Sequence, residues 1–232
     1  MTLKGYIFDY GGTLDTGGNH WGKVIWHAYQ RQHVPVTEQQ FREAYVHGEH
    51  TLGKNPIIKP DFTFRMTLEH KVRIQMDFLK NQGCEFDTEA MSQVVVSDLY
   101  QHTCEEVAHS REVLLRLKEK YPMVLVSNFY GNIATVLNEF ALDGIFLQII
   151  ESAVVGVRKP DPRIFTLGVE ALGLPAAEVM VVGDSIDKDI IPATKAGCQT
   201  AWFKGEGWTD DSVDESVAGK VITNLTELLS NE

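Results

Sequence analysis

Alternation of strand-like and helix-like segments in the second half of the chain constrains its fold more than any other feature. Short apolar runs are separated there by stretches whose apolar residues recur at helical spacing. Strands joined by helices of this length form a parallel sheet that helices cover on both faces. We therefore predict an α/β fold with a Rossmann-like core. The predicted strands are 6–8, 123–128, 146–152, 179–185, 200–203 and 220–222.

The segment between the first two predicted strands is different, because it contains helical patterns and no convincing strand. Asp87 or Thr88 is a suitable N-cap for the last of its helices, and Gly83 is a suitable stop for the third. We therefore predict a core domain formed by residues 1–16 and 109–232, and an inserted helical domain at 17–108. The expected helices of the insert are 21–32, 37–49, 64–82 and 88–108, and a separate helix is expected at 111–121.

Composition limits the partners and the compartment. With 232 residues, of which 44% are apolar, the chain can bury a full core. Its net charge of -11 argues against nucleic acid as a partner, and no stretch is long and apolar enough to span a membrane. The cysteines Cys84, Cys104 and Cys198 are widely spaced and form no metal-binding pattern. We expect a cytoplasmic protein without a leader segment.

Polar residues follow the predicted strands at the points where the strands end. Asp9 ends the first strand, Ser127 and Asn128 end the second, and Asp184 ends the fourth. Because the carboxyl ends of parallel strands lie at one edge of the sheet, these side chains are expected to meet there. Lys159 follows the third strand in a loop that Pro160 and its neighbours stiffen.

These residues form a recognisable series. Asp-x-x-x-Thr after a strand, a strand-ending Ser-Asn, Lys-Pro and Gly-Asp-Ser-x-x-x-Asp occur in this order. The series closely resembles the four motifs of the haloacid dehalogenase-like (HAD) hydrolase superfamily. The resemblance covers residues 1–16 and about 109–203, and the helical insert lies where one subgroup of that superfamily inserts a helical cap.

The resemblance implies roles for the residues of the phosphate site. Asp9 is the expected nucleophile, which takes up the transferred group as an aspartyl phosphate. Thr13 and Ser127 are expected to bind phosphate oxygens, and Lys159 to neutralise both the nucleophile and the phosphate. Asn128 is also expected at this site, where it either orients the nucleophile or caps the following helix.

The same resemblance implies a Mg²⁺ ion held by Asp184 and Asp189. A carboxylate is a weak nucleophile that a phosphate dianion repels, so the reaction needs cations beside the forming bond. Mg²⁺ prefers oxygen ligands, which Asp9, Asp184 and the main-chain carbonyl of Gly11 provide. The predicted protein is a magnesium-dependent hydrolase of a small phosphorylated metabolite.

One position departs from the phosphatase pattern. Phosphatases of this superfamily usually carry an Asp two residues after the nucleophile, where it protonates the leaving alcohol and then activates water; this chain has Gly11. The loss should matter most for poor leaving groups, because general acid-base help contributes about 100- to 10,000-fold. Asp15 or a residue of the cap is a candidate replacement. The candidate cap histidines are His20, His27, His47 and His50.

Three functions therefore stay open. The first is hydrolysis of a phosphorylated metabolite, and the second is cleavage of a carbon–phosphorus or carbon–halogen bond. The third is binding of a phosphate ligand without catalysis, because fold alone does not establish activity. A Schiff-base mechanism for phosphonates would need a cap lysine. The candidates are Lys23, Lys54, Lys59 and Lys71, and Trp21, Trp26, Tyr29 and Arg65 are candidates for the pocket wall.

Overall fold

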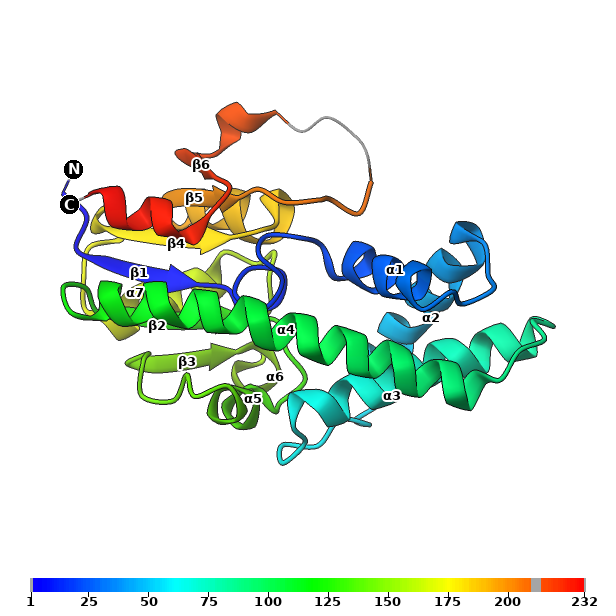
Figure 1. The fold of residues 1–232 in the computed structure, drawn as a ribbon. Helices are drawn as coiled ribbons and strands as arrows, with labels where there is room; N and C mark the ends of the chain where they lie inside the picture. Colours follow the sequence, from blue (N-terminus) through cyan, green and yellow to red (C-terminus); the bar gives the residue numbers. More distant parts are fainter. Residues whose placement is uncertain (1, 210–213, 232) are drawn as a thin grey trace.

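A computed structural model describes residues 2–209 and 214–231, which form two adjoining parts (Figure 1). One part is a parallel sheet with helices on both faces, and the other is a group of helices beyond the carboxyl ends of the strands. The sheet and its helices confirm the predicted α/β fold class. Among the described residues, no helix combines the length and the apolar character needed to cross a membrane.

The sheet has six parallel strands in the order β3-β2-β1-β4-β5-β6. Because β1 lies between β2 and β4, Phe8 is in register with Leu125 on one side and Val182 on the other. The polar residues that follow these three strands are therefore brought to one edge of the sheet. The strands are β1 (Gly5–Phe8), β2 (Met123–Ser127), β3 (Gln148–Glu151), β4 (Val179–Gly183), β5 (Gln199–Phe203) and β6 (Lys220–Ile222).

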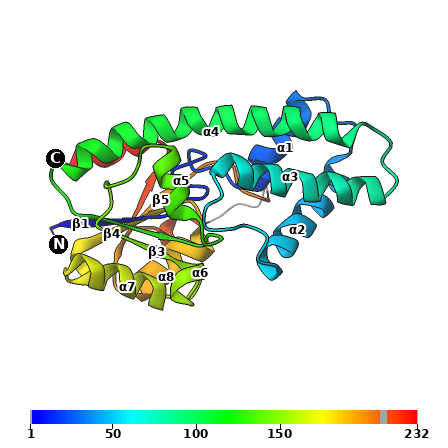
Figure 2. The same cartoon turned by 90° about the horizontal axis from the view of Figure 1, so that it is seen from below.

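Successive side chains of β1 pack on opposite faces of the sheet, as strand geometry requires. Tyr6 and Phe8 belong to a large hydrophobic cluster that includes residues of α4, whereas Ile7 belongs to a second cluster with residues of α7. Figure 2 shows α4 on one side of the sheet and α7 and α8 on the other. The helices and turns of the core are α5 (Ile133–Glu139), α6 (Ser152–Val155), α7 (Arg163–Leu172), α8 (Ile191–Lys195), η1 (Ala176–Glu178), η2 (Ile186–Ile190), η3 (Glu215–Val217) and η4 (Leu225–Asn231).

The inserted helices begin at residues whose side chains cap them, and for the last helix this cap was predicted. Thr37 forms a reciprocal capping box with Gln40, Thr63 caps the next helix, and Asp87 rather than Thr88 caps the last. The second helix continues beyond its predicted end at residue 49, and it stops where Asn55 takes the extended backbone favoured before Pro56. The elements are α1 (Trp21–Arg31), α2 (Glu38–Lys54), α3 (Phe64–Asn81) and α4 (Thr88–Lys118).

Helix α4 joins the two parts without interruption, which corrects the prediction of separate helices at 88–108 and 111–121. His109 and Ser110 lie in its interior, and the 31-residue helix contains neither glycine nor proline. Leu99 and Leu114, which lie on either side of this point, are both fully buried in the same hydrophobic cluster, so burial along its length stabilises one helix. The predicted domain boundary at residues 108 and 109 therefore falls inside a helix.

Candidate active site

The loop after β1 holds a buried carboxylate close to the turn formed by two glycines. Asp9 is 6% exposed, and its Oδ1 accepts a hydrogen bond from the main-chain N–H of Tyr10 at 2.7 Å. Gly12 has a φ of 95°, and a Cβ at this position would lie 2.5 Å from the Asp184 carboxyl oxygens. Only glycine fits this turn, because a side chain would be strained and would displace Asp184.

Thr13 connects this loop to the end of β4. Its hydroxyl donates a hydrogen bond to Asp184 Oδ1 at 3.0 Å and accepts one from the main-chain N–H of Asp184, also at 3.0 Å. The pKa of Asp184 is raised well above its ordinary value by burial and by the neighbouring carboxylates of Asp189 and Asp9. The first and fourth motifs of the chain are thus tied together before any ligand binds.

Lys159 lies between two carboxylates. Its Nζ is 2.7 Å from Asp9 Oδ2 and 2.7 Å from Asp189 Oδ1, and the residue is 3% exposed. Burial opposes the charge of the ammonium, but Asp189 and Asp9 outweigh burial and raise the pKa of Lys159 above its ordinary value. Asn128 fixes the backbone of this lysine, because its side chain donates to the Lys159 carbonyl and accepts from the Lys159 N–H.

The carboxylates of Asp9, Asp184 and Asp189 form a cluster whose oxygens lie within 4.8 Å of one another. Asp189 is fully buried, and burial raises its pKa to about 6 against the opposing effect of Lys159. Three carboxylates beside one ammonium leave an excess of negative charge in a buried site. A divalent cation with a preference for oxygen ligands would balance this charge, so the residues present fit Mg²⁺.

The other predicted residues are placed as follows. Ser127 is buried at the end of β2 beside Asn128, whose amide group is engaged with Lys159 and does not cap α5. Ser185 donates its main-chain N–H to Asp189 Oδ2, whereas Asp187 is exposed. The structure therefore brings together Asp9, Thr13, Lys159, Asp184 and Asp189, with Asn128 behind the lysine.

Asp15 and Asp9 line one cavity, and both carboxyl oxygens of Asp15 accept hydrogen bonds. Gly12 N–H donates to Oδ1 at 2.7 Å, and Trp21 Nε1 donates to Oδ2 at 3.1 Å. Burial raises the pKa of Asp15 to about 7, against the effect of these two donors, and the charge of Asp9 adds to the rise. Asp15 thereby links the loop after β1 to the first residue of α1.

The raised pKa of Asp15 predicts a pH-dependent stability. Its carboxyl binds a proton more tightly in the folded chain, with a pKa of about 7, than at the ordinary value of 3.8. This contribution to stability is complete below the ordinary pKa and is lost as the pH rises through about 7. In excess chelator, the free energy of unfolding should fall over this range. Denaturant unfolding at a series of pH values measures this fall. In Asp15→Asn the free energy of unfolding should depend less steeply on pH, and an unchanged slope would contradict the raised pKa of Asp15.

The cap supplies the opposite wall of a cavity of about 160 Å³ that contains Asp9. One face of α3 lines it, through residues at successive helical positions, and two residues one turn apart on α2 complete the wall. His20, the N-cap of α1, also lines it, and burial lowers the pKa of His20 to about 4. The cap residues in the wall are His20, Trp21, Tyr45, Glu49, Phe64, Thr67, Leu68 and Lys71.

Most other cap candidates lie outside this cavity. His27 contacts Glu206, and His47 stacks on Phe78. Trp26 packs on Phe41 inside the group of helices. The candidates Tyr29, Arg65, His50, Lys23, Lys54 and Lys59 do not line it either.

Sequence reasoning missed several residues of the wall, of which four come from α2 and from the loop after β2. Tyr45 and Glu49 come from α2, and Phe129 and Tyr130 come from the loop after β2. Glu49 follows Tyr45 by one helical turn and so extends a face that is otherwise apolar. A charged residue on an otherwise apolar helix face is the sequence feature that could have identified Glu49 as part of the site.

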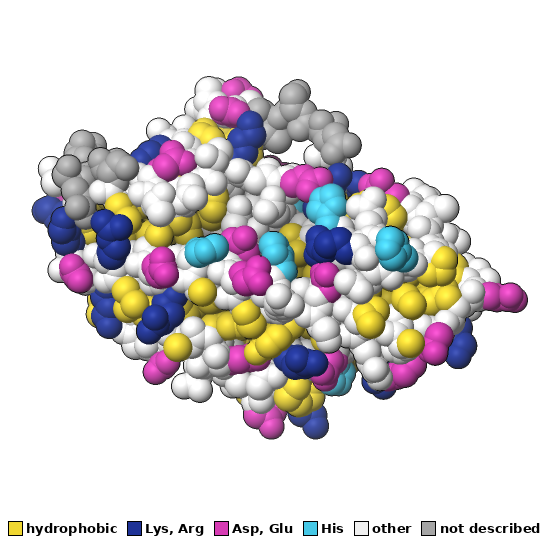
Figure 3. Space-filling view, viewed as in Figure 1, with side chains coloured by type: hydrophobic (Ala, Val, Ile, Leu, Met, Phe, Trp, Pro, Cys, Tyr) yellow, Lys and Arg dark blue, Asp and Glu magenta, His cyan; other side chains and the backbone are white. Residues whose placement is uncertain are grey.

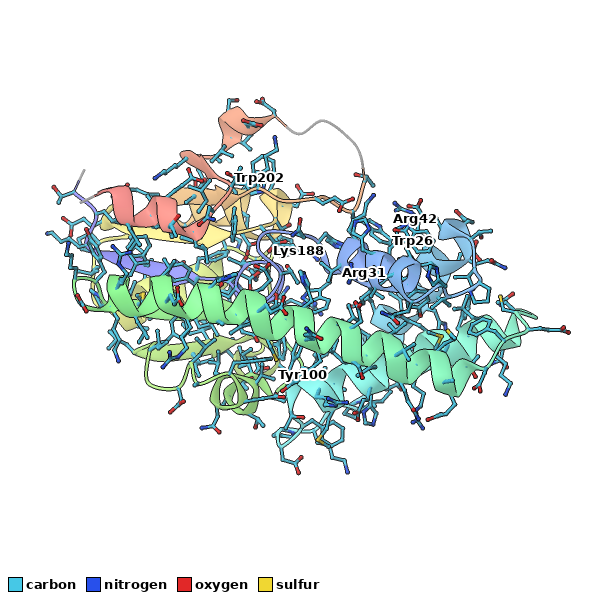
Figure 4. The ribbon with its side chains drawn as sticks, viewed as in Figure 1. Trp26, Arg31, Arg42, Tyr100, Lys188 and Trp202 are labelled. Atoms are coloured by element: carbon cyan, nitrogen blue, oxygen red, sulfur yellow. The ribbon has the colours of Figure 1, made fainter. Side chains whose placement is uncertain are left out.

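A second cavity of about 530 Å³ adjoins the first, with which it shares residues of its lining. Lys54, Arg158 and Lys188 line it, and none of these three has an ion-pair partner among the described residues. Figure 4 shows Lys188 at the junction between the sheet and α1. Elsewhere, on the face seen in Figure 3, acidic and basic side chains are interspersed. The three unpaired cations make the second cavity, beside the active site, favourable for anions.

Known proteins share this fold and part of this sequence. Glyceraldehyde 3-phosphate phosphatase of Pyrococcus furiosus is 33% identical over 129 residues, which are 53% of this chain and 53% of that protein. The chain thus spans about half the length of the curated relatives it matches.

Two solved structures cover almost the whole chain. The HAD-hydrolase YfnB of Bacillus subtilis, bound to magnesium, has a TM-score of 0.62 at 17% identity and covers 100% of this chain and 99% of its own. A dehalogenase with an intermediate complex has a TM-score of 0.65 at 17% identity, with coverage of 99% and 97%. At this identity the two structures establish the fold alone.

A family model gives the decisive comparison. The model for haloacid dehalogenase-like hydrolases matches residues 3–197, which include β1, the inserted helices and every carboxylate of the cluster. Together with the matching sheet, the residues at its carboxyl edge and the position of the insert, this match makes the chain a member of the haloacid dehalogenase-like hydrolase family.

Proposed function

We propose that the protein is a magnesium-dependent phosphohydrolase that acts on a small phosphorylated metabolite. The observation that carries this proposal is the contact of Lys159 with both Asp9 and Asp189, beside the third carboxylate of Asp184. Such a site offers a nucleophile, a fixed cation and oxygen ligands for a metal in one buried place. The name of the Pyrococcus relative, a phosphatase of a three-carbon phosphate, supports the same class of substrate.

In the proposed reaction, a carboxylate oxygen of Asp9 attacks phosphorus, and the bond from phosphorus to the leaving oxygen breaks. Water then hydrolyses the aspartyl phosphate and releases inorganic phosphate. Lys159 already contacts the nucleophile, and its charge would also offset that of the bound phosphate. Thr13, Ser127 and Asn128 are the proposed residues of the phosphate site; to donate to the phosphate, Thr13 would exchange its present bond to Asp184, and Asn128 would use its second amide proton.

Asp9, Asp184, Asp189 and the main-chain carbonyl of Gly11 would hold the Mg²⁺ ion. When bound, the ion supplies charge neutralisation at the phosphate and orients its oxygens. The reciprocal hydrogen bonds of Thr13 hold Asp184 in place for this role.

Nothing at position 11 can protonate the leaving group, because glycine has no side chain. Asp15 is a titratable candidate in the wall, but Gly12 and Trp21 already donate hydrogen bonds to both of its oxygens. We therefore assign Asp15 a positioning role and expect the enzyme to favour substrates whose leaving oxygen is already acidic, such as acyl phosphates.

A Schiff-base route to phosphonates is less well supported. Lys71 is the candidate lysine that lines the cavity. Burial alone would lower its pKa, but Glu49, Tyr130 and Tyr45 outweigh burial and raise the pKa well above the ordinary value. An ammonium held in its charged form cannot attack a carbonyl group.

The proposal is tested by phosphate release from acetyl phosphate, p-nitrophenyl phosphate and glyceraldehyde 3-phosphate in the presence of Mg²⁺. We expect turnover that excess chelator abolishes and added Mg²⁺ restores. Asp184→Asn should raise the Mg²⁺ concentration for half-maximal rate by about tenfold or more, because it removes a charged ligand.

The matched control is Asp187→Asn, three residues further along the same motif but exposed, which should behave like the wild type. Full activity in chelator would overturn the magnesium requirement. Halide release from 2-haloacids would identify a dehalogenase, and phosphate binding without turnover would identify a non-catalytic protein.

A further inference from the structure

The cap wall of the active-site cavity contains an ion pair between a buried lysine and a partly buried glutamate, in mostly apolar and aromatic surroundings. Phe64, Leu68 and Lys71 lie on one face of α3, and Lys71 is the charged member of that face. Its Nζ is 2.8 Å from Glu49 Oε1 on α2, and Lys71 is only 8% exposed. Both residues of the pair line the same cavity as the nucleophile Asp9.

The pair is held from both parts of the molecule. Tyr130, in the loop after β2, donates its hydroxyl to Glu49 Oε2 at 3.3 Å. The Lys71 ammonium lies 5.5 Å from the centre of the Tyr130 ring and 5.9 Å from that of Trp21. The geometry therefore fixes an ammonium and a carboxylate together in the wall that faces the substrate.

Burying two charges has a cost that their mutual attraction offsets only in part, so a buried pair is weak evidence for a purely stabilising role. An ammonium has three donors, and Glu49 accounts for one of them as the ion-pair partner of Lys71. Glu49 lines the cavity and its Oε1, although close to the ammonium, has no hydrogen-bond partner among the described residues, so the carboxylate retains acceptor capacity. The pair thus offers both a donor and an acceptor to a ligand.

We propose that Lys71 and Glu49 bind a neutral, hydroxylated group at the end of the substrate remote from the phosphate. The charges of the two residues cancel, so the pair has no net attraction for a carboxylate. A hydroxyl group can accept from the ammonium and donate to the carboxylate, and it uses both partners at once. This inference rests on the proposed phosphohydrolase function and names the substrate class as small polyol, aldose or hydroxyacyl phosphates.

The size of the cavity agrees with a short leaving group. A volume of about 160 Å³ corresponds to about five water molecules at roughly 30 Å³ each. A phosphate group with three or four carbons and their hydroxyl groups occupies a comparable space.

Competitive inhibition tests the inference independently of the missing acid at Gly11. Acetyl phosphate is the reporter substrate, and the inhibitors are glycerol 3-phosphate, propyl phosphate and 3-phosphonooxypropanoate, which share a three-carbon chain. We expect glycerol 3-phosphate to bind at least about tenfold more tightly than either of the other two, because only its hydroxyl groups satisfy both members of the pair.

Two variants are expected to change the order of the inhibition constants in different ways. Lys71→Met retains the apolar stem and should bring the inhibition constants of glycerol 3-phosphate and propyl phosphate within about threefold of each other. Glu49→Gln leaves the ammonium uncompensated and should shift the preference toward 3-phosphonooxypropanoate by about tenfold. A role in packing alone would not produce this change of preference. Lys80→Met, on the exposed end of α3, is the control and should leave all three constants unchanged.

The outcomes separate the two proposals. Failure to turn over acetyl phosphate or any other phosphate would overturn the proposed function itself. Turnover with equal inhibition by all three compounds, or with a wild-type preference for the carboxylate, would overturn the assignment of Lys71 and Glu49 alone. An unaltered preference in Glu49→Gln, in a variant that unfolds at the wild-type temperature, would also overturn it.

Discussion

Asp9→Asn is expected to reduce phosphate release by roughly 10,000-fold or more, because the amide cannot form the covalent intermediate. The variant should fold, since Lys159 keeps its contact with Asp189 at 2.7 Å when the charge at position 9 is removed. Steady-state rates on acetyl phosphate, together with a thermal unfolding curve, measure the two effects separately.

The control for this experiment is Asp161→Asn. Asp161 pairs with Arg163 at the surface, in the same loop as Lys159, and does not line the cavity. We expect nearly wild-type rates from it. Activity of Asp9→Asn within about tenfold of the wild type would exclude attack by Asp9.

Gly11→Asp is expected to increase the hydrolysis of alkyl phosphates such as glycerol 3-phosphate by about 100-fold, at the lower end of what an acid-base group contributes. The structure has room for the change. Gly11 lines the cavity, its φ lies outside the left-handed region, and a Cβ would meet no heavy atom within 4 Å beyond its chain neighbours. Rates across a series of leaving groups should also depend less steeply on leaving-group acidity.

The neighbouring glycine provides the matched control. Gly12→Ala should lose activity, because its φ of 95° and the nearby Asp184 carboxyl leave no place for a methyl group. If wild-type rates already show a shallow dependence on leaving-group acidity, another residue donates the proton. The result would then direct attention to His20 and Asp15, which line the cavity.

The sheet and its polar edge could be predicted because the responsible signals are local. Each strand is a short apolar run; Asp9 and Asp184 directly follow two of these runs, and Ser127 is the last residue of a third. Parallel pairing then brings the three ends together, whatever the details of the connecting helices. The position of Lys159 followed from resemblance, since its loop has no comparable pattern.

The cap wall could not be predicted in the same way. Lys71 and Glu49 lie on different helices, and only the packing of α2 against α3 shows that they meet. Trp21 and Trp26 have similar surroundings in the sequence, yet one lines the cavity and the other packs inside the cap. The rotation of a helix about its own axis decides which of its residues face the cavity, and tertiary contacts set that rotation.

Two connections of unequal stiffness link the cap to the core. One contains Gly17 and Gly18, both with positive φ, and the other is the unbroken helix α4, which Figure 2 shows along its whole length. An unbroken helix resists bending because its main-chain hydrogen bonds run through the junction, and the glycine pair has no such continuous ladder. Exchange of caps between related enzymes would have to carry α4 whole, because a junction at residue 108 would join two half-helices of different origin.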